Sequence, residues 1–332
     1  METPDYPAPY IDRSAGLIFF GILTALLGCI CALFVPIMLF SQSLVAKSGA
    51  PTTMPVMALA MGMYAALAAA LIWLGFGSMM ARRWARALIL IFSWTWLITG
   101  IFSVTLSVFV LPQTMHGMAQ TMPAGPGAPS PQMLTGIAII GLIFNAAFLV
   151  AAPAVWIYFY RSPHVKATCE ARDAVTRWTD RCPLPVLAVS LFAGASAVSM
   201  LLAPLSLKGF FPFFGMFATG LFGSVLHILA ALICAYGAWG LYRLRLDAWW
   251  LIVASVVLFS VSAVVTYSRH DVTEIYAQMG FSNQQNAEVG KIIENVGILH
   301  GPFLALTPVV SAILVVGYMV WIKKFFAGSN ER

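Results

Sequence analysis

Charged residues are scarce in this chain of 332 residues, because Asp, Glu, Lys and Arg together make up only 9% of it. Soluble globular domains contain about 25%, so this surface cannot be solvated as that of a soluble enzyme is. The composition also lacks the marks of a disordered protein, of collagen and of a disulfide-rich secreted module. Apolar residues instead make up 61% of the chain, which predicts an integral membrane protein that crosses the bilayer several times.

A second absence concerns the long apolar runs, which contain no Asp, Glu, Lys or Arg in their interiors. Ionisable groups inside a membrane usually mark proton relays and ion pathways. Their absence argues against a proton-coupled pump and excludes intramembrane proteolysis by paired aspartates. The sequence also contains no nucleotide-binding loop, serine-hydrolase elbow, zinc-protease motif or haem-attachment motif. We therefore expect a protein that is not an enzyme, and we predict no cofactor.

Eight apolar runs are long enough to cross a hydrocarbon layer about 30 Å thick, which takes roughly 20 helical residues. Runs this long and evenly apolar predict helices, since the strands of a membrane barrel alternate over about 10 residues. The expected fold is an all-α integral membrane protein with eight transmembrane helices. These helices are expected at residues 15–40, 55–80, 87–111, 134–160, 185–207, 215–242, 248–267 and 299–322.

The basic residues gather in alternate loops between these runs. Fourteen of the 18 Lys and Arg residues fall on one side, and only Lys47, Lys208, Arg269 and Lys291 fall on the other. The positive-inside rule then places the N- and C-termini in the cytoplasm of a cell with an inner (plasma) membrane of the bacterial type. The net charge of +6 follows from this topology, so we expect the lipid bilayer as a partner and no nucleic acid.

The N-terminal segment is acidic and rich in proline, unlike the basic start of a signal peptide. The apolar run that follows is longer than a signal sequence and lacks a small-residue cleavage site. We therefore expect the first run to remain as a membrane span.

The two halves of the chain resemble each other. The segment Ala69–Ile72 followed by Arg82 returns 161 residues later as Ala230–Ile233 followed by Arg243, and Val155–Ile157 returns as Val320–Ile322. An even number of spans in each half gives both halves the same orientation. The sequence therefore predicts two parallel four-helix repeats related by an axis along the membrane normal.

The predicted organisation has loops with structure of their own. A capping box of Asp271 and Glu274 starts a helical hairpin expected on the periplasmic rim, which is a lid, a docking surface or only a connector. The loop at 113–132 has no charged residue. In the connector, Asp173 and Arg177 are four residues apart, so they can pair on one face of a helix. The expected parts are a cytoplasmic tail (1–14), the first repeat (15–160), the connector (161–184), the second repeat (185–323) with its hairpin (268–298), and a cytoplasmic tail (324–332).

Two polar residues deep in the spans are candidates for an intramembrane site. His227 lies near the middle of the sixth run, where a histidine can ligate haem or metal, move protons, or simply form a packing hydrogen bond. Asn145 lies deep in the fourth run, where an amide either contacts a solute or joins helices.

Methionines near the outer end of the third run are candidates for a metal site. Met115, His116, Met118 and Met122 offer thioether and imidazole ligands of the kind that Cu(I) prefers, although methionine is also an ordinary apolar filler. A zinc site at His164, Cys169 and Cys182 would lack a clear fourth ligand.

These observations favour three functions. The first is a non-enzymatic accessory or scaffold subunit of a larger membrane complex, with other subunits as partners. The second is a transporter or permease for an uncharged or lipidic solute, with a path near His227 and Asn145. The third is a metal- or haem-binding redox protein.

Overall fold

The computed structural model describes residues 10–47, 54–121, 130–270, 272–278 and 301–326. These residues are mostly helical, and eight helices are long and apolar enough to cross a membrane. The chain thus has the architecture of a multi-pass membrane protein, and the eight predicted spans are confirmed as helices. They are α1 (Ser14–Lys47), α2 (Met54–Met79), α3 (Arg83–Thr121), α4 (Pro131–Ala146) with its continuation to Arg161, α7 (Leu184–Leu207), α8 (Gly220–Tyr242), α9 (Leu246–Tyr267) and α12 (Gly301–Ile322).

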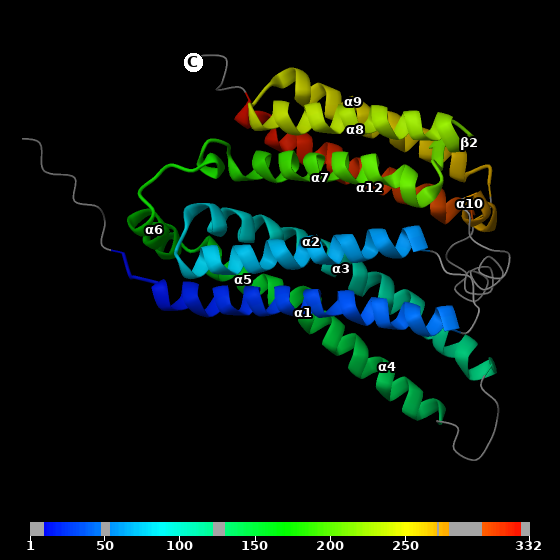
Figure 1. The fold of residues 1–332 in the computed structure, drawn as a ribbon, viewed down its shortest axis with the longest axis horizontal. Helices are drawn as coiled ribbons and strands as arrows, with labels where there is room; N and C mark the ends of the chain where they lie inside the picture. Colours follow the sequence, from blue (N-terminus) through cyan, green and yellow to red (C-terminus); the bar gives the residue numbers. More distant parts are fainter. Residues whose placement is uncertain (1–9, 48–53, 122–129, 271, 279–300, 327–332) are drawn as a thin grey trace, which may run out of the picture. The chain divides into compact units, whose positions relative to one another are not determined.

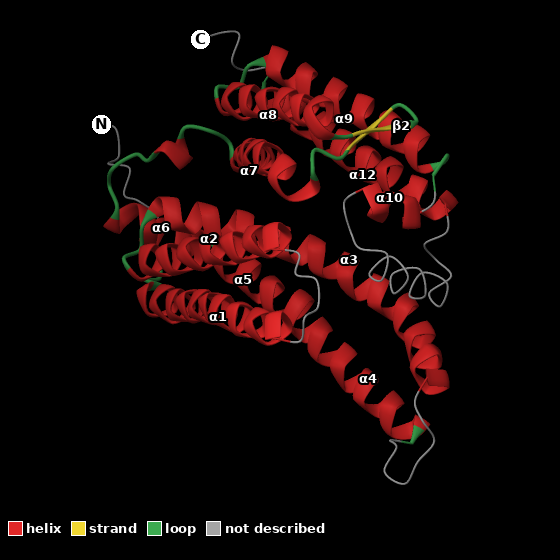
Figure 2. Ribbon diagram, turned by 45° about the vertical axis from the view of Figure 1, so that its right-hand side comes forward, coloured by secondary structure: helices red, strands yellow, loops and turns green. Residues whose placement is uncertain are grey.

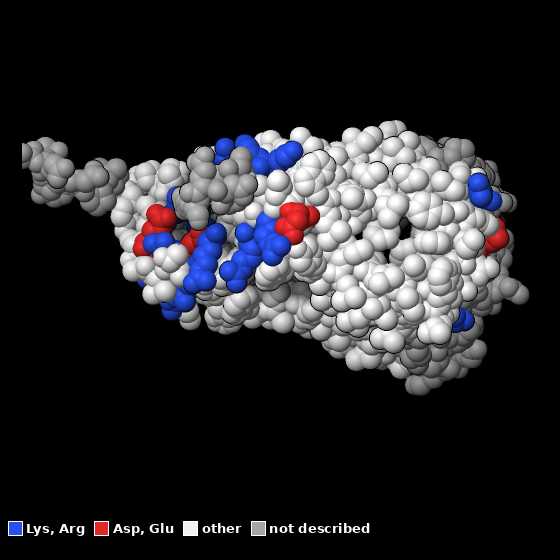
Figure 3. Space-filling view, turned by 90° about the horizontal axis from the view of Figure 1, so that it is seen from above, with Lys and Arg blue, Asp and Glu red and all other residues white. Residues whose placement is uncertain are grey.

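Charged side chains gather toward the helix ends, and the surface between those ends is uncharged (Figure 3). Large apolar side chains are exposed along the spans, for example Phe102 at 64% and Ile313 at 66%. A soluble protein rarely exposes contiguous apolar surface of this kind, whereas lipid tails solvate it.

The helices group into two compact units, which we describe separately. Unit 1 holds the described residues up to Phe40, Met61–Phe109 and Ser130–Arg181, and unit 2 holds Cys182 onward with Ser41–Ala60 and Val110–Pro129. In unit 1, helices α1 and α2 approach closely where both lack side chains. A Cβ atom on Gly21 would lie 2.8 Å from the carbonyl oxygen of Gly75, and one on Gly75 would lie 2.6 Å from that of Gly21. Such contacts hold helices together where lipid removes the hydrophobic drive.

The fourth span of unit 1 is bent by a π-helical turn. Helix α4 continues through η1 (Ala147–Ala151) into α5 (Ala152–Arg161), and Pro153 stands directly after the π turn. Proline has no amide hydrogen, so the carbonyl of Leu149 loses its helical partner. Helix α3 presents Gly100 to that carbonyl, and a Cβ there would lie only 2.0 Å from the oxygen. The close approach of α3 to the bend therefore requires a glycine at position 100.

Beyond the bend, α4 leaves the bundle of α1, α2 and α5 (Figures 1 and 2). Its start is capped by Ser130, whose hydroxyl accepts from the Met133 amide at 3.2 Å, with Pro131 in the first turn. None of the residues from Gln132 to Ala152 is buried. Ile140 is 69% exposed and Phe144 71% exposed, so α4 presents apolar side chains around most of its circumference.

The connector contains a short helix, as predicted, but the helix ends earlier than the sequence indicates. Helix α6 covers Pro163–Arg172, and the one-turn helix η2 covers Trp178–Asp180. The predicted pairing of Asp173 with Arg177 is present at 2.9 Å. Asp173 follows the last residue of α6, however, so the pair closes a turn instead of stabilising a helix.

Unit 2 contains α7, α8, α9 and α12, joined by buried side-chain hydrogen bonds. Ser190 Oγ of α7 donates to the Ala238 carbonyl of α8 at 2.7 Å. Trp249 Nε1 of α9 donates to the Met319 carbonyl of α12 at 2.8 Å. Figure 1 shows these four helices running alongside one another.

The predicted span at 215–242 begins too early. Residues Phe211–Phe213 (β1) and Met216–Ala218 (β2) instead pair as a two-stranded antiparallel hairpin, and α8 begins at Gly220 (Figure 2). Gly215 in the turn has φ +91°, which favours glycine. The phenylalanines of this segment read as part of an apolar run, which hid the turn.

The two tight turns that follow α2 and α8 have the same hydrogen bonds. Arg82 N donates to the Gly77 carbonyl and Arg245 N to the Gly240 carbonyl, each at 2.9 Å. The residues before them, Ala81 and Leu244, have φ of 51° and 56°, as in a Schellman helix end. The geometry therefore matches Arg82 with Arg245, whereas the sequence comparison paired it with Arg243.

The prediction of a loop at 113–132 is wrong in its first part, because α3 continues as a helix to Thr121. For the predicted hairpin at 268–298, the structure describes its first helix, α10 (Val272–Gln278), while residues 279–298 and Asp271 of the capping box lie outside the described residues.

Candidate functional site

His227 is buried in the first half of α8 and points toward the β-hairpin. Its Nδ1 lies 2.9 Å from the Gly223 carbonyl one turn earlier, so a proton on Nδ1 is donated to that carbonyl. Its ring meets Phe211 edge-on with centroids 5.0 Å apart, and Phe211 in turn contacts Phe259. In this arrangement the histidine supports the core beneath the hairpin.

Asn145 lies in α4, two residues before the π turn. Its Oδ1 is buried and has no hydrogen-bond partner among the described residues. A buried amide oxygen without a partner costs about 1–3 kcal/mol, so this position is a local weakness in unit 1. His227 and Asn145 belong to different units.

The methionine candidates lie at the far end of α3. Met115, His116 and Met118 belong to its last turns, whereas the sequence placed them in a loop, and Met122 lies outside the described residues. Within the part of the chain that the structure describes, no three His, Cys, Asp or Glu side chains converge as a metal site would require. Burial raises the pKa of both Cys169 and Cys182 to about 11, which disfavours the thiolate that binds zinc.

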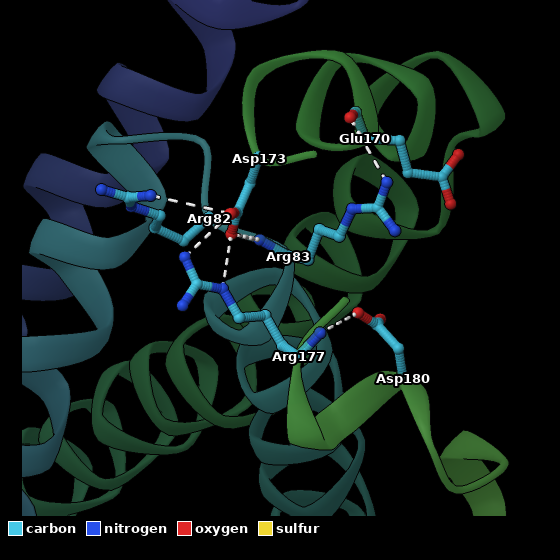
Figure 4. Close-up of polar contacts among 6 residues, drawn as sticks. All are labelled: Arg82, Arg83, Glu170, Asp173, Arg177 and Asp180. Carbon is cyan, nitrogen blue, oxygen red and sulfur yellow. Dashed lines mark hydrogen bonds and ion pairs between the residues drawn. The ribbon is translucent and has the colours of Figure 1, made fainter. Parts of the chain in front are cut away.

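The most developed polar constellation is one that the sequence did not single out as a site. It surrounds Asp173, whose carboxylate is only 1% exposed (Figure 4). Arg177 Nη2 donates to Oδ1 at 2.9 Å, and the backbone amide of Arg83 donates to Oδ2 at 3.3 Å. Arg82 Nη1 lies 3.6 Å from Oδ1. We call this set of four residues the Asp173 cluster.

The cluster joins the turn after α2 to the connector, two parts of unit 1 that are distant in sequence. Arg82 and Arg83 come from the turn between α2 and α3, Asp173 ends α6, and Arg177 precedes η2. Arg83 also donates from Nη2 to the Glu170 carbonyl, and the Arg177 amide donates to Asp180 at 2.9 Å. Figure 4 shows the guanidinium groups of Arg82 and Arg177 approaching the carboxylate from different loops.

Charge stabilisation is the main effect of this geometry. The hydrogen bond from Arg177, with those from the Arg83 amide and the charge of Arg82, holds the pKa of Asp173 below its usual range. Burial alone would raise it, so the donors outweigh desolvation. The cluster contains no nucleophile and no free carboxylate, which makes it a latch between loops and not a catalytic centre.

Beneath the cluster, buried hydrogen bonds continue the connection between helices. Ser78 Oγ donates to the Leu17 carbonyl at 3.0 Å and shares a 2.6 Å hydrogen bond with the Tyr160 hydroxyl. Arg86 Nε donates to the Tyr160 carbonyl at 3.1 Å. Because Tyr160 has no exposed surface, this network fixes the ends of α1, α2, α3 and α5 together.

A smaller latch lies in unit 2, next to the hairpin. His270 Nδ1 lies 2.9 Å from Glu274 Oε2 of α10, and its Nε2 lies 3.2 Å from the carbonyl of Gly215. Both ring nitrogens face acceptors, so the protonated imidazolium satisfies them best. The Glu274 carboxylate accordingly raises the pKa of His270 above 6.5.

This latch predicts a pH dependence. A raised pKa in the folded state means that the stabilisation is complete below about pH 6.5 and is lost as the pH rises through the folded-state value. We expect the difference in melting temperature between the wild type and His270→Gln in detergent to shrink steadily from pH 6 to pH 8.5. A difference that grows with pH would contradict the assignment.

Comparison with known proteins found no match: the chain matches no family model, no curated protein and no solved structure. Of the candidate residues, His227 contacts the Gly223 carbonyl and the Phe211 ring, and the Asn145 oxygen has no partner among the described residues. The Asp173 cluster was missed because its members are spread over about 100 residues of sequence. The available signal was three arginines in the turn after the second span and an acidic residue in the connector.

Proposed function

We propose that this protein is a non-enzymatic accessory or scaffold subunit of a larger membrane complex. The observation that carries the proposal is α4, a membrane-spanning helix with no buried residue between Gln132 and Ala146. Helices in membranes bury small and polar positions against neighbours. Unit 1 is held together at one end by the Asp173 cluster, and its helix α4 projects from the bundle. This arrangement suits a protein that binds a helix of a partner subunit.

We further propose that the protein consists of two parallel four-helix repeats, at 15–160 and 185–323, in an inner membrane with both termini cytoplasmic. Shared internal contacts support this. Gly77 faces Ala85 as Gly240 faces Ala248, with Cβ distances of 2.7 and 2.3 Å for a side chain built on the glycine.

A photocrosslinking experiment in native membranes tests the scaffold role. A photoreactive amino acid is placed at Ile140 or Phe144 of α4, and at Phe19 of α1, which is 58% exposed, as the control. We expect one discrete protein adduct from both α4 positions and none from Phe19. Adducts with lipid alone, together with a monomer in mild detergent, would contradict the proposal, as would adducts formed only between two copies of this chain.

A second candidate is a permease for an uncharged or lipidic solute. The unpaired Oδ1 of Asn145 favours it, because π turns are frequent at functional sites and polar groups inside a membrane often line solute pathways. In a variant without native cysteines, Asn145→Cys tests this. A water-lined path predicts modification by a charged methanethiosulfonate reagent while Gly141→Cys on the same helix stays unmodified, and equal protection of both positions would rule the path out.

The stability of Asn145→Leu tests whether the Asn145 amide has a polar partner in the membrane. If nothing polar meets Asn145, the substitution removes an unpaired buried oxygen, and we expect stabilisation by about 1 kcal/mol. The measurement is the melting temperature in detergent. A loss of stability would show that the amide has a partner in the membrane.

A further inference from the structure

Unit 1 contains an open groove of about 650 Å³ at the same end as the Asp173 cluster. Its floor is apolar and comes from two helices, with Trp94 and Leu97 in α3 and Ala154 and Ile157 in α5. The volume lies within the range of about 300–1,000 Å³ that small-molecule sites occupy. All the residues that line it belong to unit 1.

The mouth of the groove is basic. Arg13, Arg161 and Ser162 line it, and none of the described residues that line the groove is acidic. Ser162 precedes α6, and its hydroxyl does not cap that helix. Tyr158, exposed at 86%, lies beside the mouth, where aromatic rings occupy the headgroup level of a bilayer.

The two arginines differ from their neighbours in having no carboxylate. Arg82 and Arg177 bind Asp173, and Arg172 binds Asp12 at 3.3 Å. Over the described part of the chain, the guanidinium groups of Arg13 and Arg161 have neither an ion pair nor a hydrogen bond; Arg13 is held by its backbone amide, which donates to Thr168 Oγ1 at 3.1 Å. Both arginines are exposed, and among the described residues their guanidinium groups lie at the mouth without a carboxylate partner.

The groove changes from apolar to cationic along the helix axis. Ala154 and Arg161 are seven residues apart in α5, which corresponds to about 10 Å of helix. A free anion would use only the mouth, and a neutral lipid would use only the floor. An anionic phospholipid combines both, with a phosphate that guanidinium groups bind and a glycerol and acyl chain that follow the apolar floor.

We propose that this groove binds a phospholipid with an anionic headgroup, whose phosphate lies between Arg13 and Arg161. The lipid would connect the start of α1 with the junction of α5 and α6. The proposal does not depend on the scaffold role, because the groove is complete within unit 1.

Native mass spectrometry of the full-length protein, released from nanodiscs, tests the proposal. The discs contain equal amounts of phosphatidylglycerol and phosphatidylcholine. We expect the wild type to retain phosphatidylglycerol selectively and Arg13→Gln/Arg161→Gln to bind it roughly 30-fold less well, since each basic residue near the membrane surface contributes about fivefold. Arg181→Gln/Arg243→Gln removes two exposed arginines outside the groove and should bind like the wild type.

A second variant tests the floor without changing charge. Ala154 lines the groove and is exposed, so Ala154→Trp fills it and should also abolish selective retention. Equal retention of the two lipids by the wild type would overturn the proposal, and so would undiminished retention in either groove variant. Displacement of the lipid by millimolar inorganic phosphate would show a simple anion site and would overturn it too.

Discussion

Asp173→Asn is expected to destabilise the protein by about 2–4 kcal/mol, because it removes a buried charge and leaves its arginines without their counter-ion. The carboxylate is 1% exposed and accepts hydrogen bonds from Arg177 and from the Arg83 amide. An asparagine keeps the shape but not the charge. The measurement is the free energy of unfolding of the purified protein by titration with a denaturing detergent.

Glu170→Gln is the matched control in the same connector. Glu170 pairs with Lys166 at 3.8 Å, but both side chains are largely exposed, so we expect a change below about 0.5 kcal/mol. Arg177→Gln combined with Asp173→Asn should cost less than the sum of the single changes, because the two residues act as a pair. Additive losses of unfolding free energy in the double variant, or equal losses for Asp173→Asn and Glu170→Gln, would contradict a stabilising role of the cluster.

The cluster also has a defined response to acid. The pKa of Asp173 is lowered in the folded state, so its stabilisation is present above the unfolded value of about 3.9 and is lost as the pH falls through the folded value. Between pH 5 and 8 we therefore expect a constant difference between the wild type and Asp173→Asn. This contrasts with the His270 latch, which weakens as the pH rises.

Gly100→Leu is expected to prevent assembly of the fourth span or to cost more than about 3 kcal/mol. Its Cβ would lie 2.0 Å from the Leu149 carbonyl oxygen, which is backbone and cannot rotate away. Overpacked positions typically cost 1–3 kcal/mol when side chains can yield, so a clash with backbone should exceed that. Expression in the membrane and monodispersity in detergent report the effect.

Gly136→Leu provides the control, because a Cβ on Gly136 meets nothing within 4 Å. Leucine is a better helix former than glycine by up to about 1 kcal/mol, so we expect no loss and a small gain in stability. A well-folded Gly100→Leu protein would contradict the close contact between α3 and the π turn.

The spans were predictable because their signal is local. About 20 apolar residues in succession predict a helix whatever surrounds them, and all eight appear. The β-hairpin was not predictable, since Phe211–Phe213 and Met216–Ala218 are apolar themselves and only Gly215 and Pro212 mark the turn. The extension of α3 to Thr121 was missed because the absence of charge from 113 to 121 resembles a loop as much as a helix end.

The site residues show the limit of reasoning from one sequence. His227 and Asn145 stand out in the sequence as polar residues in apolar runs. In the structure, however, His227 contacts only a backbone carbonyl through its ring nitrogen, and Asn145 Oδ1 has no hydrogen-bond partner among the described residues. The Asp173 cluster and the groove depend on tertiary contacts between the turn after α2, the connector and α1. Of these, only the pairing of Asp173 with Arg177 has a local spacing that predicts it.

The proposed parallel arrangement of the repeats puts the Asp173 cluster and the turn after α8 on the same, cytoplasmic side of the membrane. Cysteine accessibility in intact cells tests it most directly, using a cysteine-free background with single cysteines at exposed positions. We expect Ala171→Cys and Leu246→Cys to be protected from a membrane-impermeant maleimide, and Ser130→Cys and Ser268→Cys to be labelled. Labelling of Ala171→Cys together with protection of Leu246→Cys, or the reverse, would contradict the parallel arrangement.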